Sequence, residues 1–143
     1  MSGNGMRIAF QIRPSEPWVG DKVPFVLRLD KSTAECLFLL HVDSESGTSP
    51  ASTRMHVQWG DPAQGEGKTL PGVVAGDTFT NVSIALTSNG RVPILSAQIG
   101  SAVATAITYD QCLFGTAVEV WLGFHCAPGT NEVRFDDVVV DYP

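Results

Sequence analysis

The sequence predicts an all-β protein, an antiparallel two-sheet β-sandwich. Three observations lead to this prediction. Apolar and polar residues alternate with a period of two in nearly every segment, as they do in strands that bury one face. Clusters of turn-forming residues separate these segments at short intervals. No stretch of helical length has the three-and-four spacing of apolar residues that an amphipathic helix needs.

The first half of the chain predicts four strands. Apolar side chains occupy every second position in each, the pattern of a strand with one face in the core. The inward series are Ile8, Phe10 and Ile12; Val23, Phe25, Leu27 and Leu29; Cys36, Phe38, Leu40 and Val42; and Met55, Val57 and Trp59. A turn from Asp30 to Thr33 and a polar loop from Asp43 to Thr53 separate neighbouring strands, so hairpins are the simplest connections.

The second half predicts a loop and then further strands. Residues 61–76 are dense in glycine and proline, which break regular structure, so we expect a long surface loop there. Alternation resumes at 82–86, and the Asn89-Gly90 pair that follows favours a tight turn. The remaining strands are predicted at 93–99, 102–108, 118–126 and 132–142. Many short strands separated by turns are typical of two antiparallel sheets packed face to face.

Two adjacent acids, Asp136 and Asp137, interrupt the valine-rich closing strand. Strict alternation would put Phe135, Asp137 and Val139 on one face, so one of the two carboxylates should face inward at the rim of the sandwich. A carboxylate there must accept backbone N–H groups of a neighbouring loop or bind a cation. We favour the loop-tying role over calcium.

The charge balance argues against two classes of partner. The formal net charge is −6, and the 9 lysine and arginine residues are scattered along the chain. Nucleic-acid binding needs a cluster of cations, and an anionic membrane would repel this chain. No apolar run approaches the length of a membrane span. We therefore expect no nucleic-acid partner and no membrane insertion.

A length of 143 residues suits one domain. We expect residues 6–143 to form a single β-sandwich domain and residues 1–5, rich in glycine and serine, to be an added or disordered tail. The N-terminus shows no basic segment followed by an apolar stretch, so no secretion signal is visible.

The 3 cysteines allow one disulfide with one thiol left over, or three thiols. Cys112 and Cys126 lie about one hairpin apart, which suits a bridge. Cys36 falls inside an apolar strand and is expected to be a buried thiol. The Asn81-Val82-Ser83 triplet fits a glycosylation sequon, although such triplets arise often by chance.

The strand at 117–126 carries the main candidate for a ligand site. Its even-numbered residues form a continuous apolar series, which leaves Glu119, Trp121, Gly123 and His125 on the opposite face. A tryptophan on an otherwise polar face suits a sugar platform, because the indole stacks on the ring while Glu119 and His125 bind hydroxyl groups. The alternative is that a loop covers Trp121.

Two further sets of residues are secondary candidates for ligand binding. Trp18 lies in a predicted loop, where it either stacks on a ligand or anchors the loop to the end of the sandwich. Arg54, His56 and Gln58 form a polar row that suits a concave binding sheet or is simply solvated. Trp59 alternates with Met55 and Val57 and is expected in the core.

Metal and nucleotide sites receive little support. The 3 histidines, His41, His56 and His125, lack zinc-ligand spacing, and turn acids such as Asp43, Asp61, Asp77 and Asp110 leave calcium as a possibility without a defined site. The metal ligands are therefore unknown, and no other cofactor is expected. Gly65 to Thr69 imitates a phosphate-binding loop, but Leu70-Pro71-Gly72 cannot continue into the helix that such a loop needs.

Three stretches resemble the concanavalin A-like lectin and glucanase fold, which includes laminin G-like domains and several carbohydrate-binding modules. They are Gly76 to Leu86, Trp121 to Phe124 and Val133 to Val140, so the resemblance covers mainly residues 76–142. It implies a jelly roll. Glucanases of this class resemble one another in a Glu-x-Asp-x-x-Glu strand whose outer carboxylates do the chemistry, and that pattern is missing here. A glycoside hydrolase is therefore the less favoured reading.

The resulting expectation is a non-catalytic carbohydrate-binding module that uses aromatic stacking and polar contacts on a sheet face or rim. Its partner would be a polysaccharide or glycan, and its location secreted or at the cell surface. The alternative is an accessory or adhesive module that binds protein or associates with itself. An exposed apolar patch or a free edge strand would favour that alternative.

Overall fold

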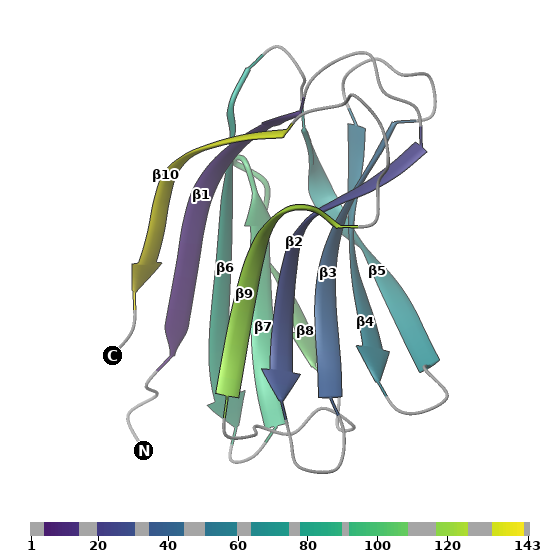
Figure 1. Cartoon of the computed structure of the whole chain (residues 1–143), viewed down its shortest axis with the longest axis vertical. Helices are drawn as coiled ribbons and strands as arrows, with labels where there is room; N and C mark the ends of the chain where they lie inside the picture. The colour runs from purple at the N-terminus through teal and green to yellow at the C-terminus, as the bar shows by residue number, and fades with distance from the viewer. Residues whose placement is uncertain are drawn as a thin grey trace.

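A computed structural model describes residues 5–14, 20–30, 35–44, 51–59, 64–74, 78–89, 92–108, 117–125 and 133–141. All regular elements in these ranges are strands (Figure 1). They are β1 (Met6–Pro14), β2 (Gly20–Asp30), β3 (Glu35–Ser44), β4 (Ala51–Trp59), β5 (Gln64–Val74), β6 (Thr80–Asn89), β7 (Val92–Ile99), β8 (Thr105–Thr108), β9 (Ala117–His125) and β10 (Val133–Asp141). Of the predicted tail, only Gly5 lies within the described residues.

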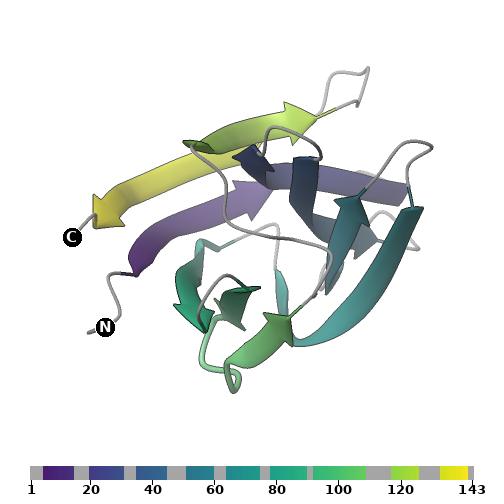
Figure 2. The same cartoon turned by 90° about the horizontal axis from the view of Figure 1, so that it is seen from below.

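The strands form two antiparallel five-stranded sheets. Sheet A has the order β10-β1-β6-β7-β8, and sheet B has the order β5-β4-β3-β2-β9. The two sheets lie against each other as layers when viewed from the end (Figure 2). The prediction of an all-β antiparallel sandwich is confirmed. The described part of the chain contains no helix with the length and apolar character of a membrane span.

The core lies between the two sheets and is built by the alternation that the sequence shows. Ile8 and Ile12 of β1 and Leu27 and Leu29 of β2 are all buried and belong to one core cluster. Phe10 links the layers: its ring stacks on Phe25 with 5.8 Å between centroids and meets Phe135 edge-on at 5.7 Å. Trp59, which was expected in the core, is only partly buried and packs against this cluster.

The predicted loop at 61–76 was wrong over most of its length, because Gln64–Val74 forms strand β5. Among the described strands, β5 is an edge strand that pairs only with β4, and most of its side chains are exposed. Such a strand is held by backbone pairing and needs no apolar alternation. Pro71 and Gly72 lie at a register shift opposite Ser52 and Thr53, and proline is tolerated at bulges of edge strands.

Thr53 provides a test of this edge. Its side chain is 1% exposed, and its hydroxyl donates to the carbonyl of Gly72 at 3.0 Å. Thr53→Val keeps the shape but leaves that carbonyl without its donor, so the free energy of unfolding should fall by about 1–2 kcal/mol in urea denaturation. Ser52→Ala is the control, because Ser52 is exposed and should change stability by less than about 0.5 kcal/mol. Equal effects of the two variants would contradict the assigned bond.

The two adjacent acids of the closing strand form a β-bulge. Between Ala9 and Gln11 of β1, the partner residues on β10 run from Val139 to Asp136, so β10 contains one extra residue. Asp137 adopts a positive φ of 48°, and its N–H donates to Oδ1 of Asp136 at 2.9 Å. The prediction that one carboxylate faces inward was wrong, since both residues are exposed. The bulge breaks the alternation on which that prediction relied.

The cysteine predictions also need correction. Cys36 is buried, as expected, but it is disulfide-bonded and is not a thiol. Cys112 and Cys126 lie outside the described residues. Because a cysteine forms only one disulfide, a bridge between Cys112 and Cys126 is incompatible with the bond of Cys36. Apolar alternation showed that Cys36 faces the core, but it could not show whether the residue meets a second cysteine there.

Candidate functional site

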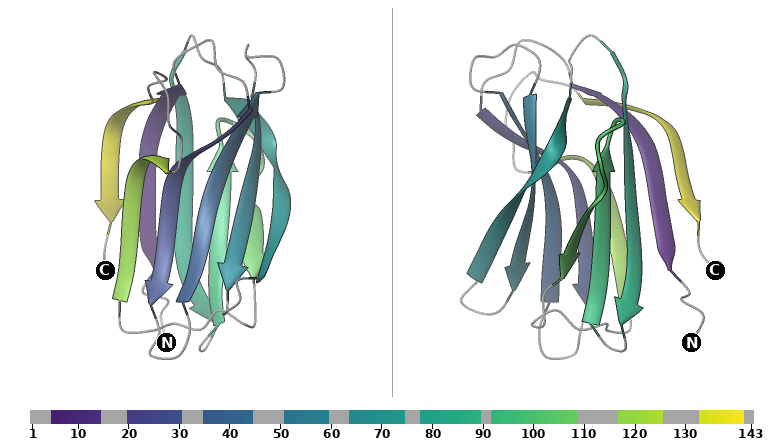
Figure 3. Two further views of the ribbon diagram at one scale, coloured as in Figure 1. Left: turned by 45° about the vertical axis from the view of Figure 1, so that its right-hand side comes forward. Right: turned by 180° about the vertical axis from the view of Figure 1, so that it is seen from behind.

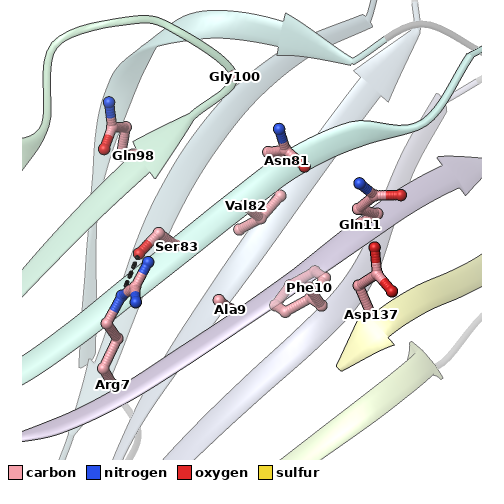
Figure 4. A pocket seen from close by; sticks show the side chains of 10 residues that line it. All are labelled: Arg7, Ala9, Phe10, Gln11, Asn81, Val82, Ser83, Gln98, Gly100 and Asp137. Atoms are coloured by element: carbon pink, nitrogen blue, oxygen red, sulfur yellow. Dashed lines mark hydrogen bonds between the residues drawn. The ribbon is translucent and has the colours of Figure 1, made fainter. Parts of the chain in front are cut away.

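The outer face of sheet A carries a hollow with a volume of about 320 Å³. Strands β10, β1, β6 and β7 lie side by side in one layer of the sandwich (Figure 3). The hollow lies over β1, β6 and β7 and reaches the bulge of β10 (Figure 4). The lining residues are Arg7, Ala9, Phe10, Gln11, Asn81, Val82, Ser83, Gln98, Gly100 and Asp137. The polar ones come from the outward positions of the alternating strands, while Ile8, Ile12 and Ile84 on the opposite face fill the core.

The strand register explains why this part of the sheet is hollow. Ala9 lies opposite Ser83, and Ser83 lies opposite Gln98, so small side chains occupy neighbouring positions on β1 and β6. The longer side chains of Gln11 and Asn81 form the next row. Beyond Asn81 stands Gly100, whose N–H donates to the Asn81 carbonyl at 2.7 Å and which has no side chain to fill the space.

Several polar groups of the hollow are held by hydrogen bonds. Nε of Arg7 donates to Oγ of Ser83 at 3.3 Å, and this bond holds the guanidinium beside β6 at one side of the hollow (Figure 4). Nη1 of Arg7 also lies 3.9 Å from Oδ2 of Asp141, but both side chains are well exposed, so this pair contributes little. Nε2 of Gln98 donates to the carbonyl of Ala102 at 3.0 Å, which orients its amide. The wall is thus partly organised before any ligand binds.

The chemistry of the hollow is that of hydrogen bonding to hydroxyl groups. Amides, a hydroxyl, a guanidinium and a carboxylate offer both donors and acceptors around a floor of small residues. Glycoside hydrolysis normally uses two carboxylates, whereas Asp137 is the one carboxylate among these lining residues. Within the described ranges, no group of three or more His, Cys, Asp or Glu side chains is placed to hold a metal ion.

The structure places Trp121 on the outer face of sheet B, on the opposite side of the sandwich. Its side chain is 43% exposed, and it stands on the edge strand β9 opposite Val26. Glu119 lies opposite Arg28 and forms an ion pair with it at 3.4 Å. The carboxylate that we assigned to sugar hydroxyls therefore already has a cationic neighbour.

His125 does not follow Trp121 by simple alternation. Phe25 pairs with Leu122 and Val23 pairs with His125, so β9 contains an extra residue between those two pairs. Such an irregularity breaks the two-residue period on which the shared face of Trp121 and His125 was predicted. The side chain of His125 lies outside those that the structure describes, and so does the whole of Trp18.

Arg54, His56 and Gln58 lie on the same outer face of sheet B but far from Trp121. His56 is three strands away from the tryptophan, about 14 Å at the usual strand spacing. Its ring meets that of His41 edge-on at 5.7 Å, and Nη2 of Arg54 lies 3.5 Å from Nδ1 of His41. This row is a packed layer rather than an extension of the Trp121 surface.

Glycines of β5 make room for this layer. A Cβ atom added to Gly65 would lie only 2.4 Å from Nε2 of His56. The glycine-rich stretch that imitates a phosphate-binding loop is thus part of a strand, and Gly65 allows the His56 ring to lie close to the backbone of β5.

The hollow on sheet A is not evident from the sequence. Alternation in residues 7–13 predicts that Arg7, Ala9, Gln11 and Arg13 face outward. The small side chain of Ala9 between long polar ones was the one local sign of a hollow there. The register that sets Ala9 beside Ser83 and Gln98 joins distant parts of the chain, and no local pattern reveals it.

Comparisons with known proteins add support for the fold alone. No protein-family model and no curated protein matches the chain. A crystal structure of a functionally unknown protein from Saccharomyces cerevisiae is similar, with a TM-score of 0.52 at 13% sequence identity. The match covers 99% of this chain and 71% of the yeast protein. At this identity the likeness shows a shared β-sandwich architecture.

Proposed function

We propose that this domain is a non-catalytic carbohydrate-binding module whose site is the hollow on sheet A. The observation that carries the proposal is the combination of a preformed depression with Arg7, Gln11, Asn81, Gln98 and Asp137 around a small-residue floor. Its volume is at the lower end for a ligand site, which suits one or two sugar rings of a longer glycan. Sugar hydroxyls both donate and accept, as the lining requires.

The proposed site lies on sheet A, whereas the sequence-based expectation placed it around Trp121, which lies on sheet B. Trp121 remains an exposed aromatic side chain, but its neighbour in the strand register is Val26, and Glu119 is already paired with Arg28. The hollow on sheet A instead gathers polar groups from four strands. We therefore assign the sugar to sheet A and treat the Trp121 surface as the alternative.

A screen of immobilised polysaccharides tests the proposed function. Protein produced in bacteria, without a glycan at the Asn81 sequon, should be retained by at least one neutral polysaccharide in affinity gel electrophoresis. Trp121→Ala should be retained equally, because that ring lies on the opposite sheet. Loss of retention in Trp121→Ala would move the site to sheet B, and no retention of the unmodified protein by any polysaccharide would remove the proposal.

A second candidate function is self-association or binding to another protein. The exposed apolar strand at the edge of sheet A favours it. β10 is the outermost strand of this sheet in the described structure, and Val138, Val139 and Val140 are 47%, 48% and 53% exposed. Exposed apolar edge strands promote pairing with another strand. If this function holds, light scattering at high protein concentration should show a dimer that Val139→Lys returns to a monomer. A monomer at all concentrations would exclude self-association through this edge.

The disulfide of Cys36 supports a secreted or cell-surface location, because disulfides persist mainly in oxidising compartments. A thiol titration under denaturing conditions should detect one free thiol before reduction and three after it, since the chain has 3 cysteines. Three thiols in protein purified without reductant would contradict the disulfide and remove this support.

A further inference from the structure

The carboxylates of the two acids in the β10 bulge, Asp136 and Asp137, have different surroundings. Oδ1 of Asp136 accepts the N–H of Asp137 at 2.9 Å, so Asp136 stabilises the local turn of the backbone. Asp137 lines the hollow, whereas Asp136 does not. Figure 4 shows the Asp137 carboxylate on the side of Gln11, at the end of the hollow away from Arg7.

An aspartate at position 137 is not explained by the backbone alone. A φ of 48° is reached more easily by glycine, and asparagine tolerates it as well as aspartate does. A second negative charge beside Asp136, in a chain of net charge −6, is electrostatically unfavourable. Among the described residues, the structure shows no hydrogen bond or ion pair to the Asp137 carboxylate. The Asp137 carboxylate is exposed beside the hollow, so both of its oxygens are open to hydrogen bonds from a ligand.

We propose that Asp137 orients the sugar in the hollow by accepting hydrogen bonds from two adjacent hydroxyl groups, and that the bulge holds its carboxylate there. This proposal rests on the proposed function and names the ligand class more closely: a neutral saccharide with a free vicinal pair of hydroxyls. A carboxylate has two acceptor oxygens, and its hydrogen bonds are stronger than those of neutral acceptors. A uronic acid or sulfated sugar would be repelled at this end of the hollow.

Three variants separate the binding role from the backbone role. Asp137→Gly removes the carboxylate and adopts a positive φ freely. Asp137→Asn keeps a residue that tolerates this conformation but has one acceptor oxygen in place of two. Asp136→Asn is the matched control, because its amide oxygen can still accept the N–H of Asp137 while one negative charge is lost. Titration calorimetry uses the neutral hexasaccharide (cello-, xylo-, manno- or maltohexaose) that the unmodified protein binds most tightly.

The expected results distinguish this proposal from a purely structural role. Asp137→Gly and Asp137→Asn should each weaken binding about tenfold or more, the loss expected for hydrogen bonds to a charged group. The thermal midpoint of Asp137→Gly should be equal to or above that of the unmodified protein. Asp136→Asn should bind within about twofold of the unmodified protein, since its carboxylate lies outside the lining.

Three outcomes would overturn the proposal in different ways. If Asp137→Gly binds the hexasaccharide as tightly as the unmodified protein does, Asp137 does not orient the sugar, while the proposed function stands. If the unmodified protein binds none of the four hexasaccharides and no polysaccharide, the proposed function fails and this inference fails with it. A lower thermal midpoint of Asp137→Gly together with weaker binding of both position-137 variants and of Asp136→Asn would indicate a structural role for the bulge alone.

Discussion

Replacing Phe10 with alanine should lower the free energy of unfolding by about 3–5 kcal/mol, the usual loss for a large core side chain. Phe10 is 2% exposed and contacts the rings of Phe25 and Phe135. Removing its ring therefore leaves a cavity between the two sheets. Since the total stability of such a domain is about 5–15 kcal/mol, much of it should disappear. Urea denaturation followed by circular dichroism measures the change.

The control for this variant is another phenylalanine that lies outside the core. Phe79 is among the exposed large apolar residues and lies under the guanidinium of Arg13, 5.1 Å from its ring centroid. Phe79→Ala should therefore reduce stability by about 1 kcal/mol or less. If the two variants were equally stable, the interior of the sandwich would not be centred on Phe10.

Replacing Ala9 with glutamine should weaken saccharide binding at least about thirtyfold, or about 2 kcal/mol. Ala9 forms part of the floor of the hollow, between Arg7 and Gln11 on the same face of β1. A longer side chain there occupies the space of the sugar and leaves the core untouched, so the unfolding midpoint should hardly change. Titration calorimetry with the selected hexasaccharide measures the affinity.

Ser96→Gln provides the matched change on the same sheet face. Ser96 lies on β7, in the row that contains Arg7 and Ala85, and it is not one of the residues that line the hollow. Its replacement should leave the affinity unchanged. An equal loss in both variants would mean that the effect of Ala9→Gln comes from the sheet in general and not from the hollow.

The fold could be predicted because period-two alternation is local and is enforced by the core. Ile8, Phe10 and Ile12, for instance, are buried as their spacing indicates. The same reasoning failed for β5, which is an edge strand held by backbone pairing to β4 and has no need of apolar alternation. It also failed at Asp136 and Asp137, because one extra residue shifts all later side chains to the other face.

The candidate site was harder to predict because it depends on neighbours across the sheet. The exposed position of Trp121 follows from local alternation. The hollow depends instead on a pairing that places Ala9 next to Ser83 and on a bulge that brings Asp137 to its rim. Two adjacent acids within an apolar strand were the visible sign of that bulge. Their sequence alone did not show which of them would line the hollow.

The most direct test of the binding surface is a nuclear magnetic resonance titration of the protein with the selected hexasaccharide. If the sugar binds in the hollow, the amide shifts that change most belong to residues 7–11 of β1, 81–83 of β6, 98–100 at the end of β7 and the bulge at Asp137. Shifts centred on Trp121 and the neighbouring strand β2, with those of β1 and β6 unchanged, would contradict it.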